Sequence, residues 1–262
     1  MEPPLRPYSP EDPSDPSATS APLRVASPSE LLNQTHSPLT GDRILAAIDL
    51  GTNSVHMVVV KIDPEIPAFT IIGREKETIR LGERNAESPT QLTAAAMNRT
   101  IEALRRCQSV AQTLKAEQIV AVTTSAVREA TNGHEFLERI EAELGLQVDL
   151  ISGVEEARRI YLGVLSGMEF NHQPHIVIDI GGGSTELILG DGQEPRFLSS
   201  TKVGAVRLTS EFVTTDPISD LEFCELQSYI RGMLERPLDE LRGSLAPEEV
   251  PRLVGTSGTI ET

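Results

Sequence analysis

Two segments of this chain combine an acidic residue with a glycine-rich turn. The first reads Ile-Asp-Leu-Gly-Thr-Asn-Ser over residues 48–54, and the second reads Ile-Asp-Ile-Gly-Gly-Gly-Ser-Thr-Glu over residues 178–186. Glycine lets backbone N–H groups converge on an anion without obstruction by Cβ, and a carboxylate at the preceding strand end can hold a metal ion beside the same oxygens. Two such turns predict two lobes that close on one polyphosphorylated ligand.

The turns do not fit the two best-known nucleotide motifs. A Walker loop needs a terminal Lys-Ser/Thr, a dinucleotide fingerprint needs a third spaced glycine, and both lead into a helix. Here β-forming residues follow each turn, at 55–62 and 187–189, so each turn joins two strands of a hairpin. Ordinary hairpins in which glycine supplies a positive φ remain the alternative, although two matched Asp-x-Gly turns favour phosphate binding.

The polar residues of the turns are candidate ligands. Asp49 and Asp179 are candidate magnesium ligands, directly or through water, or structural residues bonded to the N–H groups of their own turns. Glu186 could orient metal-bound water or could be a surface strand residue. The residues that would offer amides and hydroxyls to phosphate oxygens are Gly51, Asn53, Ser54, Gly181, Gly182, Gly183, Ser184 and Thr185.

A third acidic candidate lies in a predicted helix. Ser152 and Glu155 fit a capping box, which explains Glu155 but not Glu156. A helical projection places Glu156 beside Ile160, on the margin of an apolar face formed by Val154, Ala157, Tyr161, Val164 and Met168. A partly desolvated carboxylate there suits a general base, whereas a first-turn acid can equally stabilise the helix dipole.

Among the basic residues, Arg128 follows a Thr-Thr-Ser cluster at the end of an apolar strand, where a guanidinium could clamp phosphate. Arg80 is a weaker candidate on the same grounds, and either could be a surface residue. The remaining candidates have no partner at a spacing that suggests a ligand set: His56, His134, His172 and His175.

The predicted elements place these residues at strand and helix ends. The pattern predicts strands through residue 62, near 69–74, at 118–123 and at 147–151, a long helix from about Thr90 and another from Gly153. Residues 209–241 are mainly helical, with Pro217 and Pro237 as breakers, and residues 253–262 repeat the pattern of a strand entering a glycine turn.

Composition excludes several classes of protein. The net charge of −16 argues against nucleic acid as a partner, and no apolar run or signal peptide indicates a membrane, so a cytoplasmic protein is expected. The only cysteines, Cys107 and Cys224, are expected to be reduced and partly buried. Residues 1–42 hold nine of the 18 prolines and predict a disordered tail.

Beyond the two turns, three segments carry a family resemblance: Val-Thr-Thr-Ser-Ala-Val-Arg-Glu-Ala at 122–130, Ile-Ser-Gly-Val-Glu-Glu-Ala-Arg at 151–158, and Gly-Thr-Ser-Gly-Thr-Ile at 255–260. Over about residues 43–262 the chain resembles the exopolyphosphatase/guanosine-pentaphosphate phosphohydrolase (Ppx/GppA) family, a branch of the actin and sugar-kinase superfamily. The order of the segments is that expected for the family.

The resemblance implies a two-lobed actin-like (ribonuclease H-like) α/β fold with mixed sheets flanked by helices. Lobe I is expected over residues 43–160 and lobe II over 161–262. The sequence ends soon after Gly258, whereas related proteins continue, so either this is a fragment with an incomplete second lobe or the lobe is finished otherwise. A homodimer of the full-length form is a separate expectation.

The resemblance also implies a reaction. Glu156 matches the family's water-activating glutamate, and Arg128 matches the arginine of its Thr/Ser-rich segment. The implied activity is release of terminal orthophosphate from inorganic polyphosphate, or of the 5′-phosphate of guanosine pentaphosphate, with Mg²⁺ or another divalent cation. A superfamily kinase with an adenosine pocket around residues 255–258 and a non-catalytic phosphate or alarmone sensor are the alternatives.

Overall fold

The computed structural model describes residues 43–63, 68–83 and 90–261. Residues 1–42, for which the sequence predicts a disordered tail, lie outside this part of the chain. No helix among the described residues has both the length and the apolar character needed to span a membrane.

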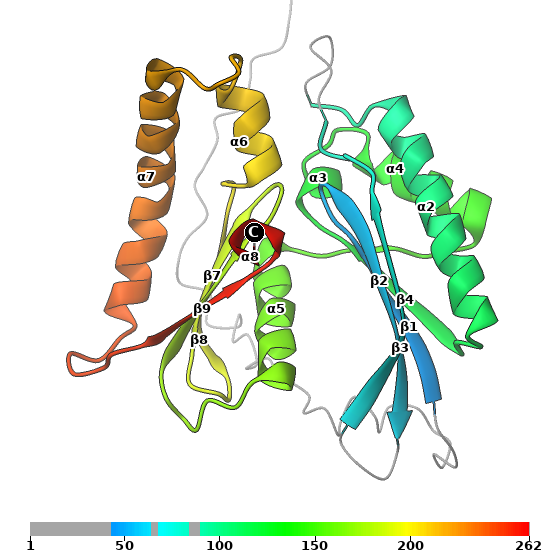
Figure 1. Cartoon of the computed structure of the whole chain (residues 1–262), viewed down its shortest axis with the longest axis horizontal. Helices are drawn as coiled ribbons and strands as arrows, with labels where there is room; N and C mark the ends of the chain where they lie inside the picture. The colour runs from blue at the N-terminus through cyan, green and yellow to red at the C-terminus, as the bar shows by residue number, and fades with distance from the viewer. Residues whose placement is uncertain (1–42, 64–67, 84–89, 262) are drawn as a thin grey trace, which may run out of the picture. The chain divides into compact units, whose positions relative to one another are not determined.

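The first sheet has five strands in the order β3-β2-β1-β4-β5 and forms lobe I with its helices (Figure 1). β1 pairs antiparallel with β2 and parallel with β4. The elements are β1 (Arg43–Leu50), β2 (Ser54–Asp63), β3 (Ala68–Thr78), α2 (Ala94–Thr113), β4 (Gln118–Thr123), α3 (Ser125–Arg128), α4 (Gly133–Leu144) and β5 (Asp149–Leu150).

The side chains of β1 alternate between two faces, so its apolar residues lie in the core of lobe I and Asp49 lies on the opposite face. Ala46, Ile48 and Leu50 are buried in the cluster that includes Ile101 and Leu104 of α2. Because successive side chains of a strand point to opposite faces, Asp49 lies on the face away from this core.

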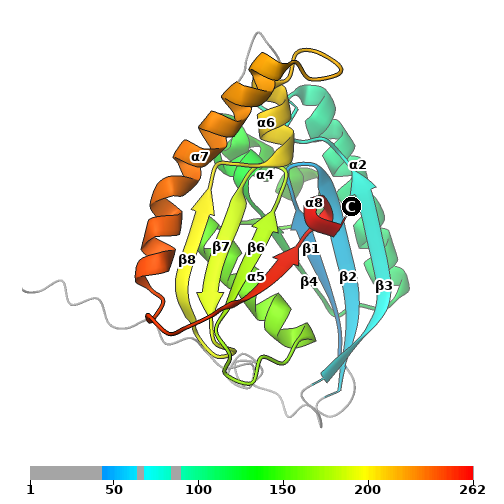
Figure 2. The same cartoon turned by 60° about the vertical axis from the view of Figure 1, so that its left-hand side comes forward.

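The second sheet has four strands in the order β8-β7-β6-β9, which lie side by side in Figure 2. Its elements are α5 (Gly153–Gly167), β6 (His175–Ile180), β7 (Thr185–Gly190), β8 (Pro195–Thr201), α6 (Ala205–Phe212), α7 (Asp220–Gly243), β9 (Arg252–Thr256) and α8 (Gly258–Glu261). Tyr161 of α5 packs on one face with Val177 and Ile188, and Leu241 of α7 packs on the other with Leu187. We call this sheet and its helices lobe II.

The two sheets share one connectivity. In each, a central strand pairs antiparallel with the next strand of the chain and parallel with a later strand that leads into a short helix. β6 therefore corresponds to β1 and β9 to β4, which makes Asp179 the counterpart of Asp49. The mixed sheets flanked by helices agree with the expected fold class.

The structure confirms β4 at 118–123 and the start of α5 at Gly153, and it adds β8, which the sequence did not predict. Pro237 is not a breaker, because it lies inside α7, where Leu234 and Leu238 pack beside the second sheet and outweigh the lost hydrogen bond. Cys224 is exposed rather than partly buried, whereas Cys107 is buried.

The expected boundary between the lobes, at residue 160, falls inside α5. Because α5 packs on the second sheet through Ala157 and Tyr161, the whole helix belongs with lobe II. We therefore propose a division near residue 152.

Candidate functional site

Both glycine turns close with the same backbone hydrogen bond. The Gly51 N–H donates to the Ser54 carbonyl at 3.0 Å, and the Gly181 N–H donates to the Ser184 carbonyl at 2.9 Å. Each turn joins two antiparallel strands, as the sequence predicts. The two turns are therefore structural equivalents.

The segment that follows the third strand of each sheet binds the carbonyl groups of the turn. In lobe I the Gly82 N–H donates to the Thr52 carbonyl at 2.8 Å, and in lobe II the Ala205 N–H donates to the Gly181 carbonyl at 2.9 Å. Because a trans peptide is planar, a carbonyl held on one side directs the next N–H to the other. The amide of Gly182 therefore points away from α6.

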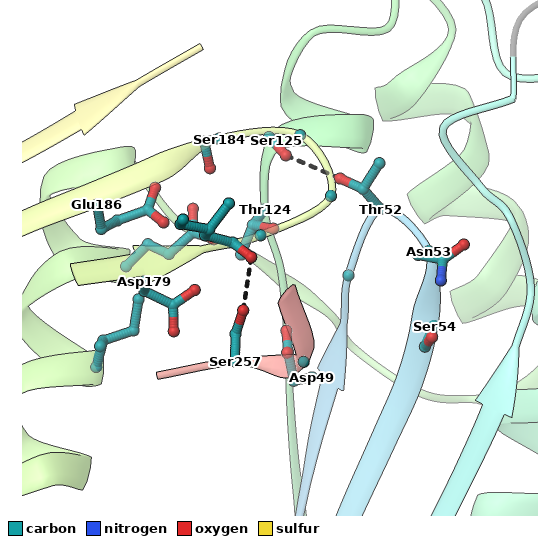
Figure 3. Close-up of a pocket in the computed structure, with 18 of the residues that line it drawn as sticks. Asp49, Thr52, Asn53, Ser54, Thr124, Ser125, Asp179, Ser184, Glu186 and Ser257 are labelled. Atoms are coloured by element: carbon teal, nitrogen blue, oxygen red, sulfur yellow. Dashed lines mark hydrogen bonds between the residues drawn. The ribbon is translucent and has the colours of Figure 1, made fainter. Parts of the chain in front are cut away.

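The parallel neighbour strands complete each half of the site. The Thr123 hydroxyl donates to the Leu50 carbonyl at 2.9 Å, and the Ser257 hydroxyl donates to the Ile180 carbonyl at 2.6 Å (Figure 3). These carbonyls end the two central strands. The duplication thus extends to the hydroxyl groups that fix the start of each turn.

The two turns approach each other closely at Gly183. A Cβ atom built there would lie 2.2 Å from the Ser125 Oγ and 2.7 Å from the Thr52 Oγ1. These two hydroxyls are themselves hydrogen-bonded at 2.9 Å (Figure 3). Only glycine fits this position without separating the turns.

A cavity of about 920 Å³ lies between these elements. Its lining includes most of the site residues predicted from the sequence: Asp49, Gly51, Asn53, Ser54, Glu156, Asp179, Gly181, Gly182, Gly183, Ser184 and Glu186. Arg128 and Thr185 do not line it. The Thr185 side chain is buried, and its hydroxyl donates to the Val203 carbonyl.

Glu156 is positioned by the first turn of α5. The Ser152 hydroxyl accepts the Glu155 N–H at 3.2 Å, so half of the expected capping box forms. The other half does not, because the Glu155 carboxylate accepts hydrogen bonds from Arg158 and Arg159. These partners lower the pKa of Glu155 to about 2.

The neighbouring Glu156 has the opposite electrostatic environment. Burial, followed by the charge of Glu186, raises the pKa of Glu156 to about 7. Arg128 opposes this rise, since its Nη1 lies 3.5 Å from the Glu156 Oε2 and also donates to the Ile151 carbonyl at 2.7 Å. Arg128 thus lies behind Glu156 rather than in the cavity lining.

The apolar face of α5 is narrower than the sequence suggested. Ala157 and Tyr161 are buried, but Val154 is 55% exposed and Met168 is 36% exposed. Ile160 packs partly against the core and also lines the cavity beside Glu156. Glu156 therefore lies on the margin of the packed face, as predicted.

The other carboxylates come from equivalent strand ends. The Asp49 side chain is open to the cavity, yet desolvation by the surrounding protein atoms, followed by the charge of Asp179, raises its pKa to about 6. Burial also raises the pKa of Glu186, although hydrogen bonds from Ser200 and Ser184 act against this. Asp179 and Glu186 face each other across β6 and β7 (Figure 3).

Three basic residues that the sequence did not mark as site residues also line the cavity: His56, Lys76 and Arg159. Burial, followed by the charge of Lys76, lowers the pKa of His56, so its imidazole is neutral near pH 7. Asp49 pairs with His56 across β1 and β2, and His56 pairs with Lys76 across β2 and β3, so the three form one row. Strand alternation starting from Asp49 could have identified His56, but Lys76 depends on the register of β3.

Comparison with known proteins identifies the family. Residues 58–262 match the Ppx/GppA phosphatase family. A protein of Aeromonas hydrophila named guanosine-5'-triphosphate,3'-diphosphate pyrophosphatase is 34% identical over 219 residues, which is 83% of this chain and 42% of that relative. The chain thus spans less than half the length of the curated relatives it matches.

Solved structures agree with this match. An exopolyphosphatase from Cytophaga hutchinsonii is 28% identical with a TM-score of 0.76, over 84% of this chain and 68% of that one. The Aquifex aeolicus PPX-GPPA enzyme is 31% identical with a TM-score of 0.66, over 84% and 69%. These similarities confirm the actin-like fold expected from the sequence. The chain belongs to the Ppx/GppA phosphatase family.

Proposed function

We propose that the cavity binds the end of a phosphoanhydride chain and hydrolyses its terminal linkage. The observation that carries the proposal is Glu156, a carboxylate with a pKa raised to about 7 inside a cavity lined by the two glycine turns. Near neutral pH such a group is partly ionised and can accept a proton from water. The water oxygen bonds to the terminal phosphorus, the anhydride P–O bond breaks, and the shortened chain leaves.

The carboxylates of Asp49 and Asp179 fit a divalent cation. Both line the cavity, and the charge of Asp179 contributes to the raised pKa of Asp49, a repulsion that a cation would relieve. Mg²⁺ is usually held by one or two carboxylates together with phosphates and water. Within the described ranges no group of three or more His, Cys, Asp or Glu side chains is arranged to hold a metal.

When bound, such an ion neutralises charge on the transferred phosphoryl group. The protein groups would act around it. The turn amides and the hydroxyls of Ser54 and Ser184 bind phosphate oxygens, and Glu186, held by Ser200, orients the attacking water. Arg128 orients Glu156 from behind, instead of clamping phosphate as the sequence suggested.

The substrate is inorganic polyphosphate or the 5′-triphosphate end of guanosine pentaphosphate. The names of the relatives support both. Lys76 also supports an extended polyanion, since its positively charged side chain lines the cavity in one row with His56 and Asp49. With a net charge of −16, attraction of such a substrate has to come from local groups of this kind.

Phosphate release from polyphosphate and from guanosine pentaphosphate, with and without Mg²⁺, tests the proposal. Glu156→Gln should lower turnover by ~10²–10⁴-fold and leave substrate affinity within about twofold, because only proton transfer is lost. Glu155→Gln is the matched control, since its carboxylate is engaged with Arg158 and Arg159. Near-normal turnover of Glu156→Gln, full activity in excess chelator, or tight binding without phosphate release would each contradict the proposal.

A further inference from the structure

Arg207, in the first turn of α6, contacts both lobes. Its Nε donates to the Gly183 carbonyl of the second phosphate turn at 3.0 Å. Its Nη2 donates to the Glu129 Oε2 at 2.6 Å, and Glu129 directly follows α3 of lobe I. One side chain thus joins the backbone of a phosphate turn to a carboxylate of the opposite lobe.

Two backbone N–H groups and the Arg207 guanidinium donate hydrogen bonds to three successive carbonyls of that turn. The Ala205 N–H donates to Gly181, the Arg207 N–H donates to Gly182 at 3.0 Å, and the guanidinium donates to Gly183. Because each peptide is planar and trans, the amides of the three following residues are directed away from α6. Those residues, Gly182, Gly183 and Ser184, line the cavity.

The first phosphate turn is held differently. There the Asn53 carbonyl accepts the backbone N–H groups of Ile79 and Arg80, both at 2.9 Å and both in lobe I. In lobe II the equivalent carbonyl is that of Gly183, which accepts a hydrogen bond from the Arg207 side chain. The same guanidinium also binds Glu129 of lobe I. Among the described residues, the hydrogen bonds that hold the Asn53 carbonyl stay within lobe I, whereas the side chain that holds the Gly183 carbonyl is also bonded to the opposite lobe.

The ion pair is shielded from solvent. The side chain of Arg207 is 15% exposed and that of Glu129 is 14% exposed. Lys202 also approaches Glu129, with its Nζ at 3.4 Å, but its side chain is 64% exposed. Removing one partner of a shielded pair leaves an uncompensated charge, whereas an exposed contact contributes little. The contact between the lobes at this point therefore depends on Arg207 and Glu129 rather than on Lys202.

We propose that Arg207 and Glu129 are positioning residues that align the amides of the second phosphate turn through contact with lobe I. The pair does not touch the reacting groups. It sets the orientation of the donors that receive the phosphate oxygens, and it does so only while the lobes are in contact at this point. The inference rests on the proposed function only for the identity of the ligand.

Hydrogen exchange without ligand gives a test that does not require activity. The amides to follow are Gly181 and Ala205, which are hydrogen-bonded within the turn and its support. Glu129→Gln changes lobe I alone, yet it should accelerate exchange of these lobe II amides by about tenfold, as should Arg207→Met. Arg236→Met, which removes an exposed pair with Glu240 on α7, is the matched control and should leave them unchanged. Unchanged exchange in Glu129→Gln would overturn the proposal.

Calorimetric titration with tripolyphosphate in the presence of Mg²⁺ gives the second test. Arg207→Met should weaken binding by about tenfold or more, Glu129→Gln by about threefold to tenfold, and the double variant no more than Arg207→Met alone, because both changes remove one linkage. Lys202→Met should change affinity by less than about twofold. Additive losses in the double variant would contradict a shared role.

The two tests separate this inference from the proposed function. If the unaltered chain binds tripolyphosphate and Arg207→Met binds it equally well, the positioning role is wrong and the proposed function stands. If the unaltered chain does not bind it, the proposed function fails and hydrogen exchange alone decides the positioning role. Should Arg207→Met fail to fold, Arg207→Lys replaces it, since one ammonium cannot reproduce the fork that reaches both Gly183 and Glu129.

Discussion

At the scale of single residues, two adjacent glutamates have opposite ionisation properties. Glu155 is paired with Arg158 and Arg159 and has a pKa lowered to about 2. Glu156, one position later, faces the cavity, where burial and Glu186 raise its pKa to about 7. A helix turns 100° per residue, so neighbours in sequence can lie in different environments. The helix position, rather than the residue type, therefore distinguishes the candidate base.

We predict that Arg128→Met shifts the acid limb of the pH–rate profile to higher pH. Glu156 must be deprotonated to accept a proton, so the rate should rise with pH through its pKa. The Arg128 charge lowers this pKa, and its removal should raise the midpoint from about 7 by about one pH unit. The measurement is kcat/KM for polyphosphate between about pH 5.5 and 9.

Arg236→Met serves as the control for this shift, because among the described residues Arg236 forms its ion pair with Glu240, an exposed residue of its own helix. A profile of Arg128→Met with lower rates but an unmoved acid limb would show that Arg128 acts on something other than the ionisation of Glu156.

At the scale of elements, the contact between the two glycine turns depends on the absence of a side chain at Gly183. Gly183 lies against Thr52 and Ser125 so closely that a Cβ atom would overlap the Ser125 hydroxyl. Gly163, in the interior of α5, has no atom within 4 Å of a built Cβ. Replacement by alanine is therefore expected to disturb the structure at Gly183 and to be accommodated at Gly163.

We predict that Gly183→Ala lowers phosphate release by at least about tenfold, because the turns must separate and their amides lose alignment. Gly163→Ala should leave phosphate release unchanged and stabilise the chain by roughly 0.5–1 kcal/mol, since alanine is the better helix former. Turnover and thermal denaturation of both variants measure these effects. Equal activity of the two variants would show that the close approach of the turns is not needed.

The features of the site that depend on local sequence patterns could be predicted, whereas those that depend on tertiary contacts could not. The turns and the start of α5 follow from local patterns, and the Ser152 N-cap forms as expected. The positions of Lys76 and Arg207 depend on strand register and on contact between distant segments, which a local pattern does not encode. Pro237 was misjudged because packing of α7 on the sheet outweighs a local penalty. Tertiary contacts therefore determine the parts of the site that the sequence left open.

At the scale of the whole molecule, the cavity holds two carboxylates whose ionised form is less favourable in the folded chain than in the unfolded chain. The pKa of Asp49 is raised to about 6 and that of Glu156 to about 7, so the folded chain holds protons that the unfolded chain would release at neutral pH. By linkage, these groups favour folding least when they are ionised. If these carboxylates act as proposed, the chain is less stable at neutral pH because of groups that its function requires.

We predict that Glu156→Gln is more stable than the unaltered chain at pH 8 and equally stable near pH 4.5. The folded pKa of Glu156 lies above its unfolded value, so its stabilising contribution is complete below about 4.5 and is lost as pH rises through about 7. Removing the charge should restore on the order of 1–3 kcal/mol at pH 8, since each pKa unit corresponds to about 1.4 kcal/mol. Glu155→Gln is the control with the opposite sign: its lowered pKa stabilises the fold at neutral pH, and the difference from the unaltered chain should vanish as pH falls toward about 2. Thermal denaturation in chelator across this pH range measures both effects. If Glu156→Gln were less stable than the unaltered chain at pH 8, favourable contacts of the ionised Glu156 carboxylate would outweigh the cost of its desolvation.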